Sequence, residues 1–324
     1  MRAIDAYYML RPLIPRPVQV FLRRAAVRRM RGRVADIWPI DRRCGTPPPG
    51  WGGWPEGRRF AVVLTHDVDT AEGQRKSHEL IRLEEAMGVR SSFNFVAERY
   101  PVSSELRARL SEADFEVGVH GLYHDGKLYE SWETFRDRAI RINRYLSDWG
   151  AVGFRSPAMH HNLDWIHEFD IEYDASTFDT DPFEPQSDGV GTIFPFLVGG
   201  EDGRRGYIEL PYTLPQDFTL FVLLRERGIE IWKRKLDWIA ESGGMALLNT
   251  HPDYMNFGDG APGNEEYPAE HYREFLSYLR TRYRGKYWAA LPREMARFWR
   301  ESVARETPGT ASGTVSGKSA GGMG

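Results

Sequence analysis

The sequence predicts an α/β protein built on a distorted (β/α) barrel of about seven parallel strands. Short apolar runs rich in β-branched and aromatic residues recur along the chain, and amphipathic helical patterns lie between most of them. No break between about residues 56 and 300 suggests a second domain. Apolar strands that alternate with amphipathic helices are typical of a parallel sheet covered by helices. About seven such units in about 245 residues fit a closed or nearly closed barrel.

Seven segments are predicted as strands because each combines β-branched or aromatic residues in a short apolar run. They cover residues 60–69, 91–98, 115–121, 151–157, 171–177, 206–213 and 245–252. Helices are predicted where apolar residues recur every three or four positions and so share one helical face. This pattern covers residues 131–149, 229–241 and 269–284, the first with Phe135, Ala139, Ile142, Leu146 and Trp149.

Residues 1–55 are predicted to form a basic, helix-prone arm that ends in a Pro/Gly/Trp linker. Residues 1–43 hold eleven Arg and three Asp, a charge of +8, which leaves −11 for the rest of a chain whose net charge is −3. Residues 46–55 are too rich in Pro and Gly for regular structure. We expect the arm to pack on the barrel with solvated arginines. Contact with an anionic membrane surface is the alternative.

The rest of the composition narrows the class of protein. The single cysteine, Cys44, permits no intrachain disulfide. No apolar run resembles a secretory signal or a membrane span, so we expect a cytoplasmic location. The net charge gives no indication of a nucleic-acid partner. Residues 307–324 are small, polar and rich in glycine, and a disordered tail is predicted over residues 301–324.

Chemically reactive side chains lie at the ends of five predicted strands. Barrel enzymes assemble their sites from the carboxyl ends of several parallel strands, and buried strand ends are poor places for charged groups that nothing satisfies. The set therefore predicts an active site. Its members are Asp67, Asp69, His120, His124, Arg155, Asp174, Asp179, His251 and Asp253.

Within this set, His120, His124 and one carboxylate predict a metal site. The two histidines are four residues apart in a glycine-rich loop after a strand, so both can bind one ion. Asp67 and Asp69 share one face of a strand, where like charges resist joint ionisation. A cation relieves this conflict, or one Asp binds metal while the other acts as a base. Two His and one Asp suit a divalent ion, zinc above all, although cobalt, nickel or iron could replace it.

Two further strand-end residues complete the expected chemistry. A His opposite the metal could protonate a leaving amine, and His251 is placed for that role. Arg155 cannot lose its charge, so it would keep a neighbouring base ionised. Metal-activated water, a base and an acid together predict hydrolysis.

With these residues in place, residues 58–255 resemble the polysaccharide deacetylases, also called the chitooligosaccharide-deacetylase homology group or carbohydrate esterase family four. Five ordered motifs of that family have counterparts in the same order, and residues 56–300 would be its catalytic domain. The counterparts are THDVDT, HGLYH, RSPAM, YDASTFDTDPF and LLNTHPDY. The second motif has Gly121 in place of Ser/Thr, and the third ends in Met159 instead of Gly.

The resemblance implies a role for each site residue. Asp67 would be the general base, and Asp69, shifted by one position, would bind metal with His120 and His124; the two Asp could exchange roles. Arg155 would position Asp67, a backbone N–H near Ala158 would form the oxyanion hole, and Asp179 would orient the general acid His251. The residues assigned to substrate binding are Ala158, Tyr123 and Tyr254.

The resemblance also implies the substrate, which is the acetyl group of N-acetylated amino sugars in a polysaccharide or its precursor. A small cyclic amide or ureide is the alternative substrate for the same chemistry. A carbohydrate-binding protein without catalysis is a third alternative.

Overall fold

The computed structural model describes residues 15–200 and 205–306. Seven parallel strands form its centre, each inside a predicted segment. They are β1 (Phe60–Val68), β2 (Ser92–Phe95), β3 (Glu116–Val119), β4 (Gly153–Phe154), β5 (Tyr173–Asp174), β7 (Tyr207–Glu209) and β8 (Met245–Thr250). Six of them follow one another in the order β1, β2, β3, β4, β5 and β7, while β8 pairs with the other edge of β1. An isolated parallel bridge from Leu214 to Leu248 joins the chain after β7 to β8, so the sheet curls into a barrel.

Other strands lie outside this set and were not predicted. The antiparallel β6 (Phe196–Val198) pairs with β7, and β11 (Tyr287–Ala289) pairs with the start of β1. A separate short pair consists of β9 (Met255–Asn256) and β10 (Tyr267–Pro268). All four are only two or three residues long.

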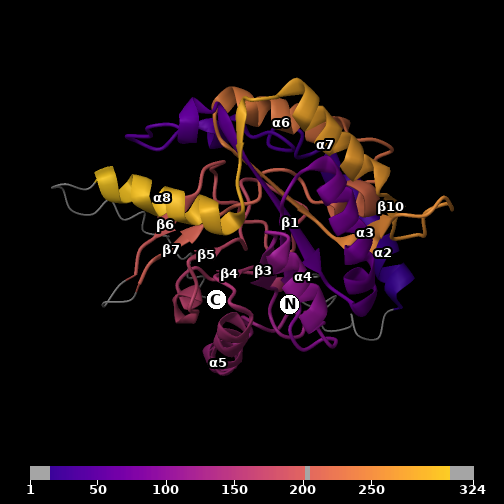
Figure 1. Ribbon diagram of the computed structural model, residues 1–324. Coiled ribbons are helices and arrows are strands. Elements are labelled where there is room, and N and C mark those ends of the chain that lie inside the picture. Colours follow the sequence, from indigo (N-terminus) through magenta and orange to yellow (C-terminus); the bar gives the residue numbers. More distant parts are fainter. Residues whose placement is uncertain (1–14, 201–204, 307–324) are drawn as a thin grey trace, which may run out of the picture.

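Helices surround the strands (Figure 1). They are α3 (Ala71–Met87), α4 (Ser104–Glu112), α5 (Trp132–Trp149), α6 (Glu230–Ser242), α7 (Glu270–Arg282) and α8 (Pro292–Glu306). In α5 the predicted apolar face is buried through Phe135, Ala139, Ile142 and Leu146. Because α8 continues to Glu306, the predicted start of a disordered tail at residue 301 is wrong. The rest of that tail lies outside the described residues.

Short helical turns connect these elements. They are η2 (Arg42–Gly45), η3 (Pro55–Gly57), η4 (Pro157–Met159), η5 (Trp165–Glu168), the π-helix η6 (Phe218–Leu223) and η7 (Pro252–Tyr254). Across the described ranges, no helix combines the length and the apolar character that crossing a bilayer requires.

The described part of the N-terminal arm packs on the barrel. It begins with α2 (Arg16–Arg31), whose Val20 and Val27 are buried. Further along the arm, the backbone carbonyls of Ile37 and Cys44 accept hydrogen bonds from the barrel. Both hydrophobic contact and backbone pairing thus fix the arm. Residues 1–14, which the arm prediction also covers, lie outside the described residues.

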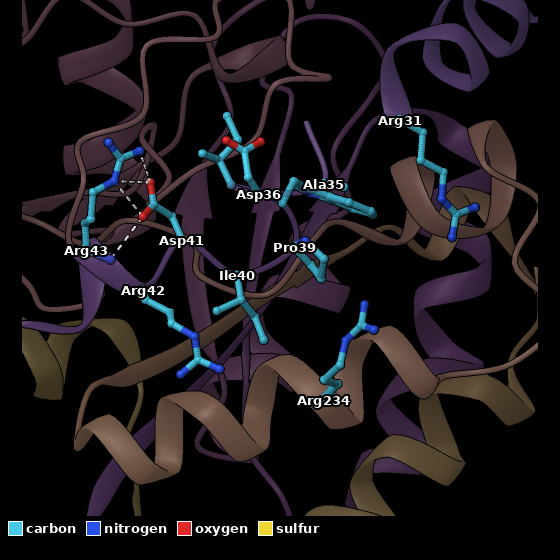
Figure 2. Close-up of a pocket in the computed structure, with 11 residues that line it drawn as sticks. Arg31, Ala35, Asp36, Pro39, Ile40, Asp41, Arg42, Arg43 and Arg234 are labelled. Atoms are coloured by element: carbon cyan, nitrogen blue, oxygen red, sulfur yellow. Dashed lines mark hydrogen bonds and ion pairs between the residues drawn. The ribbon is translucent and has the colours of Figure 1, made fainter. Parts of the chain in front are cut away.

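A hollow of about 690 Å³ lies between the end of the arm and α6 (Figure 2). Arginines from both sides line it, among them Arg42 and Arg234. Arg43 is paired with Asp41 at 2.6 Å, and Arg31 is paired with Glu226 at 2.6 Å. The hollow marks the boundary between arm and barrel.

Candidate active site

The register of the sheet places the reactive side chains at one edge. Asp67 of β1 is the direct partner of Asn94 in β2, and Asn94 is the partner of Gly118 in β3. A Cβ at Gly118 would lie 2.1 Å from Asn94 Oδ1, so only glycine leaves room for that amide. Asn94 then donates from Nδ2 to Asp67 Oδ1 at 2.9 Å. The ends of β1, β2 and β3 therefore lie side by side at this edge.

Asp69, His120 and His124 form a candidate metal site, with one ligand atom from each within 4.8 Å of the other two. Asp69 Oδ1 lies 3.4 Å from His120 Nε2 and 3.2 Å from His124 Nε2. This oxygen is buried and accepts no hydrogen bond. A buried carboxylate oxygen facing two imidazole nitrogens is the environment that a divalent cation would satisfy. Among the described residues, the cluster that could hold a metal ion consists of the three residues that were predicted as ligands.

Neighbouring groups orient two of these ligands. His120 Nδ1 lies 2.9 Å from Arg155 O, and because a carbonyl only accepts, Nδ1 carries the proton and Nε2 is free to bind metal. The backbone N–H of Asp69 donates to Asp253 Oδ2 at 3.0 Å, and Thr70 Oγ1 donates to Asp253 Oδ1 at 2.5 Å. Asp253 thus fixes the turn that carries Asp69.

The loop between the two histidines has an unusual backbone. His124 has φ +55° and Gly121 has φ +67°. A Cβ at Gly121 would lie 2.8 Å from Pro157 Cγ, which explains why glycine replaces the Ser/Thr of the family motif. A left-handed conformation is costly for a histidine, and such strain is concentrated at functional sites.

Asp67 is buried between the metal ligands and His251. Its Oδ2 lies 3.9 Å from His120 Nε2 and 4.0 Å from His251 Nε2. Burial alone would raise the pKa of Asp67, but neighbouring positive charges, those of Arg155 and His251 among them, outweigh burial and lower this pKa to about 2. Asp67 is therefore ionised at neutral pH.

Arg155 is fully buried beside Asp67. Its Nη1 donates to Thr65 Oγ1 at 2.7 Å and to Asn249 Oδ1 at 2.6 Å, and lies 3.4 Å from Asp67 Oδ1. Asn249 in turn donates from Nδ2 to Asp67 Oδ2 at 2.7 Å. The guanidinium therefore contacts Asp67 directly and also holds Asn249, which donates to the same carboxylate.

His251 is held by a carboxylate, but not by the predicted one. Its Nδ1 donates to Asp217 Oδ1 at 2.7 Å, and its backbone N–H donates to Asp217 Oδ2 at 2.7 Å. Burial alone would lower the pKa of His251, but the Asp217 charge outweighs burial and raises this pKa to about 10. His251 is therefore protonated at neutral pH, with Nε2 facing Asp67.

The assignment of Asp179 as the orienting acid is wrong. Asp179 Oδ2 accepts a hydrogen bond from Lys235 Nζ at 2.6 Å, and no contact joins Asp179 to His251. Register explains the difference. Asp217 and His251 each lie three residues beyond the Leu214–Leu248 bridge, which brings them side by side.

The three residues assigned to substrate binding lie around the site, and that assignment stays a prediction. Ala158, in η4, has φ +57° and follows the Arg155 strand. The Tyr254 ring centroid lies 5.2 Å from that of His251. Tyr123 stands beside His124 and contacts the guanidinium groups of Arg138 and Arg141.

Sequence reasoning missed Asn94, Asn249 and Asp217. Asn94 and Asn249 are polar residues within apolar strand runs, and Asp217 lies four residues after the predicted strand at residues 206–213. A buried amide or carboxylate needs a partner, so each of these positions implied a second polar group nearby. Only the strand register shows which group that is.

Fold and site together define a class: a (β/α) barrel with an Asp-His-His candidate metal site beside a buried Asp and a protonated His. No protein-family model matches the chain, and no curated protein matches it. Solved structures do match.

Three similar structures have nearly the same extent as the chain. A protein assigned as a polysaccharide deacetylase from Mycobacterium smegmatis is 20% identical, with a TM-score of 0.60 over 82% of this chain and 98% of its own. The Puue allantoinase is 16% identical, with a TM-score of 0.60 over 82% and 98%. A probable polysaccharide deacetylase from Pseudomonas aeruginosa PAO1 is 17% identical, with a TM-score of 0.59 over 84% and 100%. The chain thus has the fold of the polysaccharide deacetylases, as the motifs implied.

Proposed function

We propose that the chain is a metal-dependent amide hydrolase that removes acetyl groups from N-acetylated amino sugars of a polysaccharide or its precursor. One observation carries the proposal. Asp67 lies between the candidate metal ligands and His251, with Oδ2 3.9 Å from His120 Nε2 and 4.0 Å from His251 Nε2. A base between a metal site and an acid is the arrangement that amide hydrolysis requires.

In the proposed reaction, Asp69, His120 and His124 hold one divalent ion. When bound, such an ion supplies a Lewis acid and lowers the pKa of water. Asp67 accepts a proton from the water that attacks the acetyl carbon. His251 donates the proton from Nε2 to the sugar nitrogen as the C–N bond breaks, which yields acetate and a free amine.

The hydrogen bonds of the site support these two roles. Asn94 and Asn249 each donate to one oxygen of Asp67, which orients the carboxylate and keeps it ionised. Asp217 keeps His251 protonated and exposes Nε2 as the proton donor. We also propose zinc as the ion, because two imidazoles and one carboxylate form an open zinc-type donor set.

Acetate release from a panel of acetylated amino-sugar oligomers, with and without a chelator, tests the proposal. We expect activity that the chelator abolishes and that zinc restores. Asp67→Asn should lower kcat by roughly a thousandfold or more, because the base is lost, while bound metal measured by elemental analysis stays stoichiometric. Full activity in Asp67→Asn, or in the chelated protein, would contradict the mechanism.

A cyclic amide or ureide is the competing substrate in the same assay. The Puue allantoinase is as similar to the chain in fold as the first deacetylase, with a TM-score of 0.60 for each. Hydrolysis of a cyclic ureide without acetate release would show that cyclic ureides, and not acetylated sugars, are the substrate class. Glycan binding without either reaction would favour a non-catalytic carbohydrate-binding protein.

A further inference from the structure

Helix α2 exposes an unusual number of apolar side chains. Six large apolar side chains are exposed in the described part of the chain, and four of them lie on α2. Phe21 is 68% exposed, Val18 is 45% exposed and Leu22 is 44% exposed. These three positions and Ala25 share one face of the helix by their spacing. The first two turns of α2 therefore present an apolar strip to solvent.

The opposite face of α2 fixes this orientation. Val20 and Val27 are buried against the barrel. Arg24 donates from Nε to Val222 O at 2.8 Å and from Nη1 to Asn264 Oδ1 at 2.9 Å. Two of the anchoring contacts thus come from a buried arginine, and the helix cannot turn its apolar strip inward without breaking them.

The charged residues of α2 itself are all positive. No acidic residue occurs between positions 6 and 35 of the sequence. Arg28, Arg29 and Arg33 are exposed, and no side-chain hydrogen bond or ion pair joins them to another described residue. An apolar strip that continues into free arginines along one helix is the pattern of a helix lying in the plane of an anionic membrane surface.

We propose that α2 docks the protein on an anionic phospholipid membrane, with Phe21 and Leu22 inserted at the headgroup boundary and Arg28 and Arg29 on lipid phosphates. Charge complementarity selects this occupant over a second copy of the chain, because two copies of the face would place arginine against arginine. The anchoring by Arg24 means that docking needs no rearrangement of the barrel.

Docking would bring the candidate active site close to the bilayer. The Arg23 guanidinium lies 4.9 Å from the Phe218 ring centroid, and that ring lies 4.9 Å from the Tyr254 ring. Tyr254 in turn packs against His251. Two aromatic rings thus separate the helix from the proposed general acid. An acetylated sugar carried on a membrane lipid would be within reach, and this consequence alone rests on the proposed function.

Vesicle co-sedimentation of the full chain tests the docking without any substrate. The probes are vesicles of phosphatidylcholine alone and vesicles of phosphatidylcholine mixed with phosphatidylglycerol, at low and at physiological salt. We expect binding to the mixed vesicles only. Phe21→Ser with Leu22→Ser should weaken binding about tenfold or more, because two apolar side chains no longer insert. Arg28→Gln with Arg29→Gln should weaken it by about fivefold for each arginine, mostly at low salt.

The chain offers matched controls for both variants. Ile140 and Leu197 are 65% and 41% exposed, and they lie away from the arm on α5 and β6. Changing both to Ser, or changing the exposed Arg136 and Arg144 of α5 to Gln, should leave vesicle binding unchanged. Circular dichroism and the melting temperature verify that each variant folds.

Three results would overturn the proposal. One is a wild-type protein that binds no anionic vesicle at low salt. A second is unchanged binding in Phe21→Ser with Leu22→Ser. The third is a wild-type dimer in solution that this double variant converts to a monomer without any vesicle binding, since a second copy would then occupy the face. Inactivity towards acetylated sugars would contradict the proposed function and leave the docking result as it stands.

Discussion

Asp217 and Asp179 each pair with a buried, positively charged side chain, and the two pairs lie in different surroundings. Asp217 contacts His251 Nδ1 at 2.7 Å, and Asp179 contacts Lys235 Nζ at 2.6 Å. His251 has a second nitrogen, Nε2, that faces Asp67 across the site. Lys235 instead donates a further hydrogen bond to Pro39 O in the arm. One pair points into the site, and the other closes the contact between arm and barrel.

The comparison shows that burial and pairing by themselves do not identify a catalytic acid. Burial raises the pKa of Asp179 to about 6 despite the opposing charge of Lys235. The shifted pKa alone would suggest a functional role for Asp179. Its partner Lys235, however, has no free proton donor directed at the site. A catalytic pair needs an open second atom, and only His251 supplies one.

Asp217→Asn and Asp179→Asn should separate the two pairs by activity, which is the largest expected effect. His251 is protonated below about pH 10, and general-acid activity should be lost above that pH. Without the Asp217 charge, the effect of burial dominates and the pKa of His251 falls. The alkaline limb of the pH–rate profile should therefore shift to lower pH by several units. We expect kcat/KM at neutral pH to fall roughly a thousandfold. In Asp179→Asn the pH–rate profile should keep its shape, and identical profiles for the two variants would contradict the assignment.

Lys235→Met should reveal the structural role of the other pair. An unpaired carboxylate would remain buried, which costs about 3 kcal/mol in the free energy of unfolding at neutral pH. The loss should shrink as the pH falls, because without the Lys235 charge the pKa of Asp179 rises further and the carboxyl takes up a proton in the folded state. Urea denaturation at pH 5 and pH 8 measures both values. Lys233→Met is the control, because Lys233 forms ion pairs with the exposed Glu230 and Glu274, and its loss should cost less than about 0.5 kcal/mol.

Gly121→Ala, in the loop of the site, should have the smallest effect. The left-handed backbone and the approach of Pro157 should together cost about 2 kcal/mol in the metal-free protein. Gly126→Ala is the matched control, since Gly126 has φ +75° but open space around a Cβ. It should cost about 1 kcal/mol. Urea denaturation measures the free energy of unfolding of both variants. Equal losses would mean that Pro157 moves aside and that its close approach does not constrain residue 121.

Much of the barrel was predictable because each central strand and helix carries a local pattern. The seven parallel strands lie inside the predicted segments, and the apolar spacing of residues 131–149 matches the buried face of α5. The boundary at residue 301 was wrong because it was placed ahead of the change in composition, which begins at Thr307 after the end of α8. Short strands such as β6 depend on a partner strand and leave little trace in the sequence.

The spacing in the sequence by itself indicated His120 and His124 as candidate metal ligands, and the resemblance to the deacetylase motifs indicated Asp69. Asp69 is next to a strong strand, and His120 and His124 are close together in one glycine-rich loop, so local patterns suffice to bring these types of side chain to the sheet edge. Only the tertiary structure decided which carboxylate holds His251. Asp217 and His251 are far apart in sequence and meet through the Leu214–Leu248 bridge. That pairing depends on strand register, which local patterns in the sequence do not encode.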